Sequence, residues 1–210
     1  MTDTASYTVE TVLLVEDEER LADHYAEVLK TDYDVVAVYS GTEALEVVDG
    51  AVDAVLLDRK MPVPSGGEVL EQLRDQGYDF PVAMLTAVRP DWDIVEMRFD
   101  DYLLKPVDIQ ALHNAVERLE ALGGIERKKR EYIRHNIKQA SLEGQKDASD
   151  LTSSEAFKQL KSDLSEKGSE LGDITADLSP AERHALFERD AGIEAVRGDV
   201  RGIVDRVREE

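Results

Sequence analysis

The chain has 210 residues, of which 46 are acidic and 25 are basic, so its formal net charge is −21 at neutral pH. A hydrophobic content of 42% is typical of a globular protein. The absence of cysteine excludes disulfides, thiolate nucleophiles and cysteine-ligated metal centres. Because nucleic-acid phosphates are bound by clustered Lys and Arg, the acidic balance argues against non-specific nucleic-acid binding.

The excess negative charge is concentrated in one part of the chain. Residues 1–120 contain 27 acidic and 9 basic residues, a net charge of −18, whereas residues 121–210 contribute only −3. We interpret most of these acids as a solvated surface suited to molar salt, where the Debye length is about 3 Å and self-repulsion is screened. A local field that binds cations or steers a partner is the alternative interpretation.

The sequence has no pattern of a membrane or targeting segment. No apolar run approaches the roughly 18 residues that indicate a membrane span. The first ten residues lack the basic start and the apolar stretch of a signal peptide. We therefore expect a cytoplasmic protein without a membrane partner.

Five short apolar runs alternate with helical patterns through residue 122. The runs that predict strands are Thr11–Glu16, Asp34–Tyr39, Ala51–Leu57, Pro81–Thr86 and Asp101–Leu104. The first and third are almost wholly apolar, as expected for parallel strands covered on both faces. Apolar residues between the runs recur at helical spacing, as Leu112, Val116 and Leu119 do after the fifth run. This alternation predicts an α/β fold in which helices cover both faces of an open parallel sheet.

The apolar pattern changes after residue 122. Gly123 and Gly124 predict the end of a helix, since glycine terminates helices at little cost. The chain beyond them has no strand pattern, which predicts an all-α region. Its first helix carries the basic run 127–130, which we interpret as a solvated helix face.

Three further patterns predict helices in this region. Thr152 and Glu155 form a capping-box pattern ahead of apolar residues at helical spacing. Ser179-Pro180 predicts a second helix start. Apolar residues from 193 to 207 have the spacing of a short coiled-coil seam, so we expect a final amphipathic helix at 191–210.

Polar residues follow four of the five predicted strands, at the points where the strands end. They are Glu16 and Asp17, Asp58, Thr86, and Lys105. In an open parallel sheet, ligands bind beyond the carboxyl ends of the strands. Three carboxylates in one crevice repel each other and favour a hard cation such as Mg²⁺. Together with a lysine and a hydroxyl group, such a site can hold a phosphoryl group, and a carboxylate can itself be the nucleophile.

At these residues the sequence resembles the receiver domain of two-component response regulators, over residues 9–122. The matching segments are VLLVEDEE (12–19), VLLDRKMP (55–62), VAMLTA (82–87) and DYLLKP (101–106). The resemblance implies a flavodoxin-like sheet of five parallel strands in the order 2-1-3-4-5. The segment between Thr86 and Lys105 is shorter than usual and contains Pro90, so we expect only a short helix there.

The resemblance also implies a role for each strand-end residue. The residues implied in the phosphorylation chemistry are Asp58 as the phosphorylated residue, Lys105 and Thr86. The ligands implied for Mg²⁺ are Glu16, Asp17, Asp58 and the backbone carbonyl of Lys60. Thr86 and Tyr102 match the switch pair of the family.

Residues 125–190 resemble the HalX domain, which is found behind receivers in haloarchaea. Tyr132, the segment IKQASLE (137–143) and Ser154-Glu155 carry that resemblance. A haloarchaeal origin agrees with the interpretation of the acidic surface as suited to high salt.

The implied function is that of a response regulator. A sensor histidine kinase would phosphorylate Asp58, and the helical C-terminal region would signal to a downstream protein. The C-terminal helices are also a candidate homodimer interface. Such a protein catalyses only its own phosphorylation and dephosphorylation, so we do not expect a conventional enzyme.

Three alternative functions compete with this one. A transcriptional regulator that binds DNA through the C-terminal region would need a basic recognition helix, which the sequence does not display. A hydrolase using Asp58 would need a second aspartate two residues on, where the chain has Lys60. A receiver that is never phosphorylated is disfavoured by the complete set of site residues.

Overall fold

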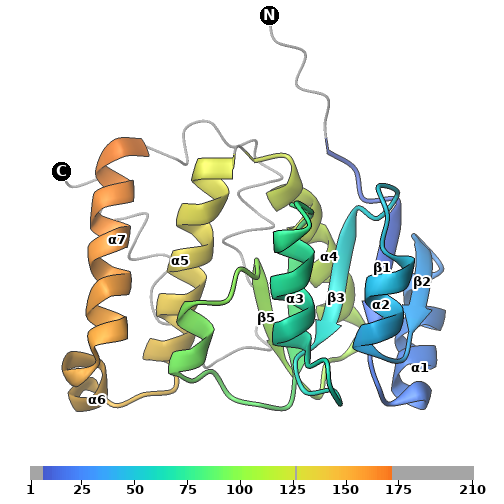
Figure 1. Cartoon of the computed structure of the whole chain (residues 1–210), viewed down its shortest axis with the longest axis horizontal. Coiled ribbons are helices and arrows are strands. Elements are labelled where there is room, and N and C mark those ends of the chain that lie inside the picture. The colour runs from blue at the N-terminus through green and yellow to red at the C-terminus, as the bar shows by residue number, and fades with distance from the viewer. Residues whose placement is uncertain (1–6, 126, 172–210) are drawn as a thin grey trace, which may run out of the picture. The chain divides into compact units, whose positions relative to one another are not determined.

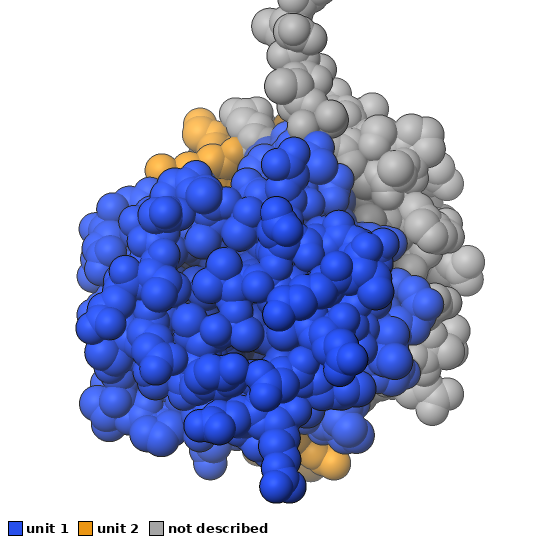
Figure 2. All heavy atoms as spheres, turned by 90° about the vertical axis from the view of Figure 1, so that its right-hand side faces the viewer, with its two compact units in different colours: residues 1–88, 98–125 blue, residues 89–97, 126–210 orange. Residues whose placement is uncertain are grey.

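The computed structural model describes residues 7–125 and 127–171 of the chain. The chain divides into two compact units, coloured in Figure 2. Unit 1 comprises residues 1–88 and 98–125, and unit 2 comprises residues 89–97 and 126–210. A short piece of sequence inside the receiver-like region therefore belongs to the helical unit.

Unit 1 is built on a five-stranded parallel sheet (Figure 1). Its strands are β1 (Thr11–Val15), β2 (Asp34–Val38), β3 (Ala54–Asp58), β4 (Val82–Thr86) and β5 (Asp101–Leu104). The strands are ordered β2-β1-β3-β4-β5, which confirms the predicted fold class. β3 begins three residues later than predicted, because residues 49–52 form a turn in which the amide of Val52 donates to the carbonyl of Asp49.

Helices cover both faces of this sheet, as Figure 1 shows. They are α1 (Glu19–Leu29), α2 (Gly41–Val47), α3 (Gly66–Asp75) and α4 (Ile109–Gly123). The α1 and α4 helices contact each other on one face, and α2 and α3 contact each other on the other. β3 and β4 are buried along their whole length, as expected for central strands between two helical layers.

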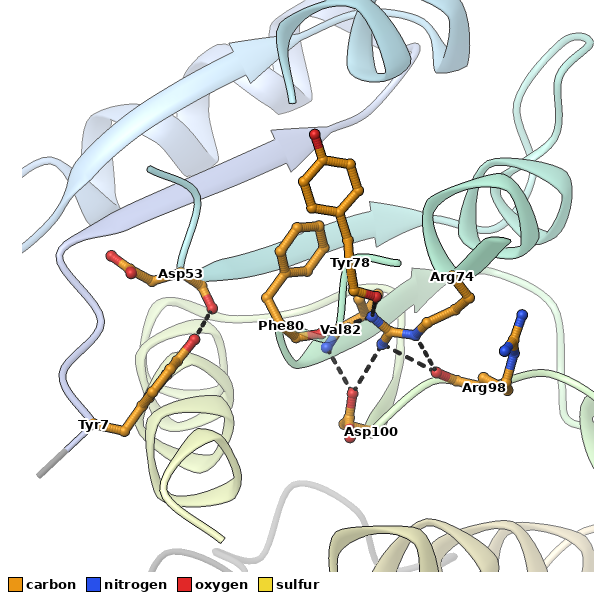
Figure 3. A network of polar contacts seen from close by, with 8 residues as sticks. All are labelled: Tyr7, Asp53, Arg74, Tyr78, Phe80, Val82, Arg98 and Asp100. Atoms are coloured by element: carbon orange, nitrogen blue, oxygen red, sulfur yellow. Dashed lines mark hydrogen bonds and ion pairs between the residues drawn. The ribbon is translucent and has the colours of Figure 1, made fainter. Parts of the chain in front are cut away.

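A buried network joins α3 to the segments that lead into β4 and β5 (Figure 3). The Arg74 guanidinium lies 3.3 Å from the Asp100 carboxylate, which also accepts a 2.9 Å hydrogen bond from the amide of Val82. Arg74 further donates to three backbone carbonyls, those of Tyr78, Phe80 and Arg98. Each charged group is thus compensated inside the fold, as buried charges require.

Unit 2 is helical in its described part. It contains α5 (Arg127–Glu143), α6 (Ala148–Ser153), α7 (Glu155–Leu171) and the single 3₁₀ turn η1 (Trp92–Val95). The η1 turn contacts α5 and α7 and buries Ile94 completely. A short helix between the fourth and fifth strands was predicted and is confirmed.

Two details of the predicted helical region are wrong. Thr152 does not cap a helix; it lies inside α6, where its hydroxyl donates to the carbonyl of Ala148. The cap of α7 is Ser154, whose extended backbone separates the two helices and whose hydroxyl accepts from the amide of Phe157. The basic run is not wholly solvated either, because Arg130 is only 4% exposed.

The remaining C-terminal predictions lie outside the described residues. These are the helix start at Ser179-Pro180, the seam at 193–207 and the amphipathic helix at 191–210. In the part of the chain that the structure describes, no helix is both long and apolar enough to cross a membrane.

Candidate functional site

The polar residues predicted at the strand ends come from four neighbouring elements of the sheet. Glu16 follows β1, Asp58 is the last residue of β3, Thr86 is the last residue of β4, and Lys105 follows β5. All strands run in parallel, so these positions share the carboxyl edge of the sheet.

Lys105 bridges the two buried carboxylates of this edge. Its Nζ atom lies 2.5 Å from Oε2 of Glu16 and 2.6 Å from Oδ2 of Asp58. Glu16 is 1% exposed and Asp58 is 5% exposed. One ammonium group therefore compensates two buried carboxylates, and the site retains excess negative charge.

The pKa values of this group follow from burial and mutual contact. Burial raises the pKa of Glu16 above its ordinary value, although the hydrogen bond from Lys105 opposes that effect. Burial alone would lower the pKa of Lys105, but hydrogen bonds to Asp58 and Glu16 and their charges outweigh it and raise this pKa. Lys105 is accordingly held as an ammonium group.

Three carboxylates form an acidic cluster at the same edge. Glu16, Asp17 and Asp58 each offer one oxygen, and these oxygens lie within 4.8 Å of one another. Asp17 is exposed, so the cluster opens to solvent on its side. The amide of Lys60 donates to Oδ1 of Asp58 at 2.9 Å and fixes the orientation of that carboxylate.

The predicted switch residues converge on the backbone of Val88. Thr86 is completely buried, and its Oγ1 atom accepts a 3.0 Å hydrogen bond from the amide of Val88. Tyr102 is 4% exposed, and its hydroxyl donates to the carbonyl of Val88 at 2.7 Å. The same hydroxyl accepts a 2.9 Å hydrogen bond from the Arg59 guanidinium. Arg59 was not predicted, because a basic residue after an aspartate has no pattern that shows its partner.

Gly66 is a second site residue that sequence reasoning missed. It is the first residue of α3, and its amide donates to the carbonyl of Arg59 at 3.2 Å. A Cβ atom at this position would lie 2.0 Å from the carbonyl oxygen of Asp58. The start of α3 can therefore approach the Asp58 backbone only without a side chain. The capping box of Ser65 and Glu68 could have located this helix start.

A strand-end site of this composition on a parallel 2-1-3-4-5 sheet is the arrangement of a receiver domain. Residues 12–117 match the model of the response regulator receiver domain family, and the chain belongs to that family. Residues 124–187 match the model of the HalX domain. The chain thus carries a response regulator receiver domain followed by a HalX domain.

Similar proteins include named regulators of transcription. A Haloferax volcanii protein with the provisional name of transcriptional regulator is 45% identical over 154 residues, 73% of this chain and 26% of that protein. The transcriptional regulatory protein CpxR of Escherichia coli K12 is 36% identical over 115 residues, 53% of this chain and 48% of CpxR. The chain thus spans half or less of the length of these relatives.

Solved receiver domains have the same fold. The chemotaxis protein CheY4 of Vibrio cholerae is 27% identical with a TM-score of 0.50, covering 53% of this chain and 99% of that one. The non-phosphorylated HemR receiver domain of Leptospira biflexa is 28% identical with a TM-score of 0.50, covering 53% of this chain and 94% of that one. Both similarities concern about half of the chain.

Proposed function

We propose that this response regulator is switched by phosphorylation of Asp58 by a sensor histidine kinase. An oxygen of the Asp58 carboxylate attacks the phosphorus atom of the kinase phosphohistidine. A P–O bond forms and the P–N bond breaks, which leaves an aspartyl phosphate on the regulator and returns the histidine, protonated, to the kinase. The observation that carries this proposal is the position of Asp58, held between Lys105 and the Lys60 amide at the edge of the sheet.

Lys105 and Thr86 are proposed to hold the phosphoryl oxygens. Lys105 already contacts Asp58 at 2.6 Å, so its ammonium group can follow the charge when that charge moves to the phosphoryl group. Thr86 supplies a hydroxyl donor from the end of the adjacent strand. Hydrogen bonds to charged groups contribute about 1.5–3 kcal/mol each, enough to shift a two-state domain.

The acidic cluster is proposed to bind Mg²⁺. Its donors are oxygens only, which suits this hard cation, and one exposed member leaves room for bound water. Glu16, Asp17 and Asp58 would hold the ion, with the carbonyl of Lys60 as a further ligand. When bound, the ion would neutralise charge on the transferring phosphoryl group.

We propose that the receiver, at residues 9–122, catalyses its own phosphorylation and dephosphorylation. The HalX-like region, at 125–190, would pass the signal to a downstream protein or to a second copy of the chain through the C-terminal helices. Sedimentation with and without beryllofluoride separates these outputs, because only self-association doubles the mass.

The test of the proposed function uses a small phosphodonor. Wild-type protein incubated with acetyl phosphate and MgCl₂ in high KCl should gain one phosphoryl group by intact mass spectrometry, and Asp58→Asn should gain none. Asp49→Asn, which alters an exposed acid in the turn before β3, should behave as the wild type does. Failure of the wild type to be modified would overturn the proposal.

The names of the relatives favour transcriptional regulation as a second candidate. Three basic residues of α5 face inward and are unavailable to DNA, whereas Arg127 and Lys128 of the same helix are exposed. Arg130, Arg134 and Lys138 are between 4% and 7% exposed. A mobility shift that weakens steeply with salt would establish this second function.

A further inference from the structure

We propose that residues 89–97, named here the output segment, carry the signal from the receiver because they are built into the helical unit. Arg59 is the positioning residue of this route: it orients Tyr102, which holds Val88 just before the output segment. This inference rests on the proposed phosphorylation of Asp58 and adds its route of output. The output segment separates β4 from β5 in sequence, yet it belongs to the helical unit, where its η1 turn contacts α5 and α7.

Aromatic and cationic side chains fix the output segment within unit 2. The Trp92 ring packs edge-on against Phe157 of α7, with ring centroids 6.3 Å apart. The ammonium group of Lys146 lies 5.3 Å from the centroid of the Trp92 ring and 2.8 Å from the carboxylate of Asp91. Edge-to-face and cation–π contacts of this kind depend on geometry, so they respond to small shifts of the segment.

The backbone of the output segment is held as well. Lys138 of α5 is 4% exposed and donates a 2.6 Å hydrogen bond to the carbonyl of Val95. Ile94 between these contacts is completely buried. The segment is thus anchored to the helical unit through Ile94 and the Val95 carbonyl, while Asp91, Asp93 and Glu96 face solvent.

Within unit 1, side chains of the site hold Val88, the residue immediately before the output segment. Thr86 accepts from the Val88 amide, and Tyr102 donates to the Val88 carbonyl. Arg59 donates to the Tyr102 hydroxyl and thereby orients it toward that carbonyl. Arg59 directly follows Asp58 in the chain, so the residue that orients Tyr102 is the sequence neighbour of the residue proposed to be phosphorylated.

Phosphorylation would weaken both hydrogen bonds that fix the backbone of Val88. A phosphoryl group brings a charge of about −1.5 to −2, which competes with the Tyr102 hydroxyl for the Arg59 guanidinium. The Thr86 hydroxyl would move toward the phosphoryl oxygens and weaken its bond with the Val88 amide. The amide and the carbonyl of Val88 would both lose their side-chain partners, and the resulting shift of the backbone would continue along the chain into Arg89–Met97.

Trp92 is the only tryptophan of the chain, so its fluorescence reports on the output segment directly. We expect beryllofluoride with Mg²⁺ to shift the emission of the full-length wild type. Phe157→Leu and Lys146→Met should remove most of this shift while acetyl phosphate still modifies Asp58. Lys158→Met is the matched control, since Lys158 lies on α7 but pairs only with the exposed Glu155 among the contacts seen.

The positioning role of Arg59 is tested by measuring Trp92 emission in the unmodified protein. Arg59→Met should move the emission of the unmodified protein toward that of the beryllofluoride form, and Arg59→Lys should restore much of the wild-type emission. Hydrogen exchange of α5 and α7 peptides gives a second readout. The exchange rates of unmodified Arg59→Met should also move toward those of the beryllofluoride form of the wild type. A purely structural role of Arg59 would lower the unfolding midpoint without this change of state.

The possible failures are distinguishable. If the wild type gains no phosphoryl group, the proposed function fails and the route fails with it. If the wild type is modified while the emission and the exchange of α5 and α7 stay constant, only the route is overturned. The route is also overturned if Phe157→Leu and Arg59→Met respond as the wild type does.

Discussion

Single residues in this protein show how strongly burial decides the effect of a charge. The Arg74 and Asp100 side chains are 3% and 0% exposed, and each makes further hydrogen bonds to backbone groups. The Arg98 and Asp75 side chains form a pair of similar length, 3.2 Å, but are 49% and 71% exposed. Water screens the second pair, whereas removal of one partner of the first leaves a charge inside the fold.

Arg74→Met is therefore expected to lower the free energy of unfolding by about 3–5 kcal/mol, because it breaks a buried ion pair with Asp100 and removes hydrogen bonds to three backbone carbonyls. Arg98→Met is the matched control and should change it by less than about 1 kcal/mol. Urea unfolding followed by circular dichroism measures both. Equal losses in the two variants would contradict the argument from burial.

A second prediction at the residue scale concerns pH. Burial lowers the pKa of His135 below the ordinary 6.5, and the charges of Lys138 and Lys167 act in the same direction. The unfolded chain then binds more protons than the folded chain below this value, so stability is lost as the pH falls through this region. Stability should thus decrease from about pH 7.5 to about pH 5.5 by more in the wild type than in His135→Gln. Parallel pH profiles in urea would contradict the expectation.

At the scale of elements, the start of α3 depends on the absence of a side chain. Gly66→Ala would place a methyl group 2.0 Å from the Asp58 carbonyl oxygen. The three nearest atoms all belong to the backbone, so no side-chain rotation can relieve the clash. We expect a loss of about 1–3 kcal/mol, typical of overpacking, together with slower phosphorylation of Asp58.

The matched control for this substitution is Gly50→Ala. No atom lies within 4 Å of a Cβ built at Gly50, so its unfolding midpoint and phosphorylation rate should stay near those of the wild type. Thermal unfolding and acetyl phosphate kinetics report both variants. A Gly66→Ala protein as stable and as reactive as Gly50→Ala would show that α3 does not need this close approach.

The strands and the strand-end residues could be predicted because both depend on local pattern. Buried parallel strands appear in the sequence as apolar runs. The sheet topology then brings Glu16, Asp58 and Lys105 to the carboxyl edge of the sheet. The partner of Arg59 could not be predicted, since its contact with Tyr102 joins positions 43 residues apart. Thr152 was misassigned because Ser154 offers the same hydroxyl chemistry closer to the helix.

At the scale of the whole molecule, the sequence divides differently from the structure. Gly123 and Gly124 mark the end of α4 as predicted, and they suggest one clean boundary between two successive regions. Residues 89–97 cross that boundary in space, through contacts such as Trp92 with Phe157. Such long-range packing has no periodicity in the sequence, so the output segment could be recognised only in the folded chain.

The net charge of −21 leads to a last prediction for the whole molecule. Like charges on the folded surface repel each other over a Debye length of about 10 Å at 0.1 M salt, which shrinks to about 3 Å at 1 M. Stability should therefore rise with KCl. A triple variant, Glu27→Gln, Glu46→Gln and Glu71→Gln, removes exposed acids from α1, α2 and α3. It should be more stable than the wild type at low salt and depend less on KCl, because both proteins share every other effect of the salt. Unfolding midpoints across a KCl series measure the difference, and a variant less stable than the wild type at low salt would show that these acids stabilise the fold by local contacts.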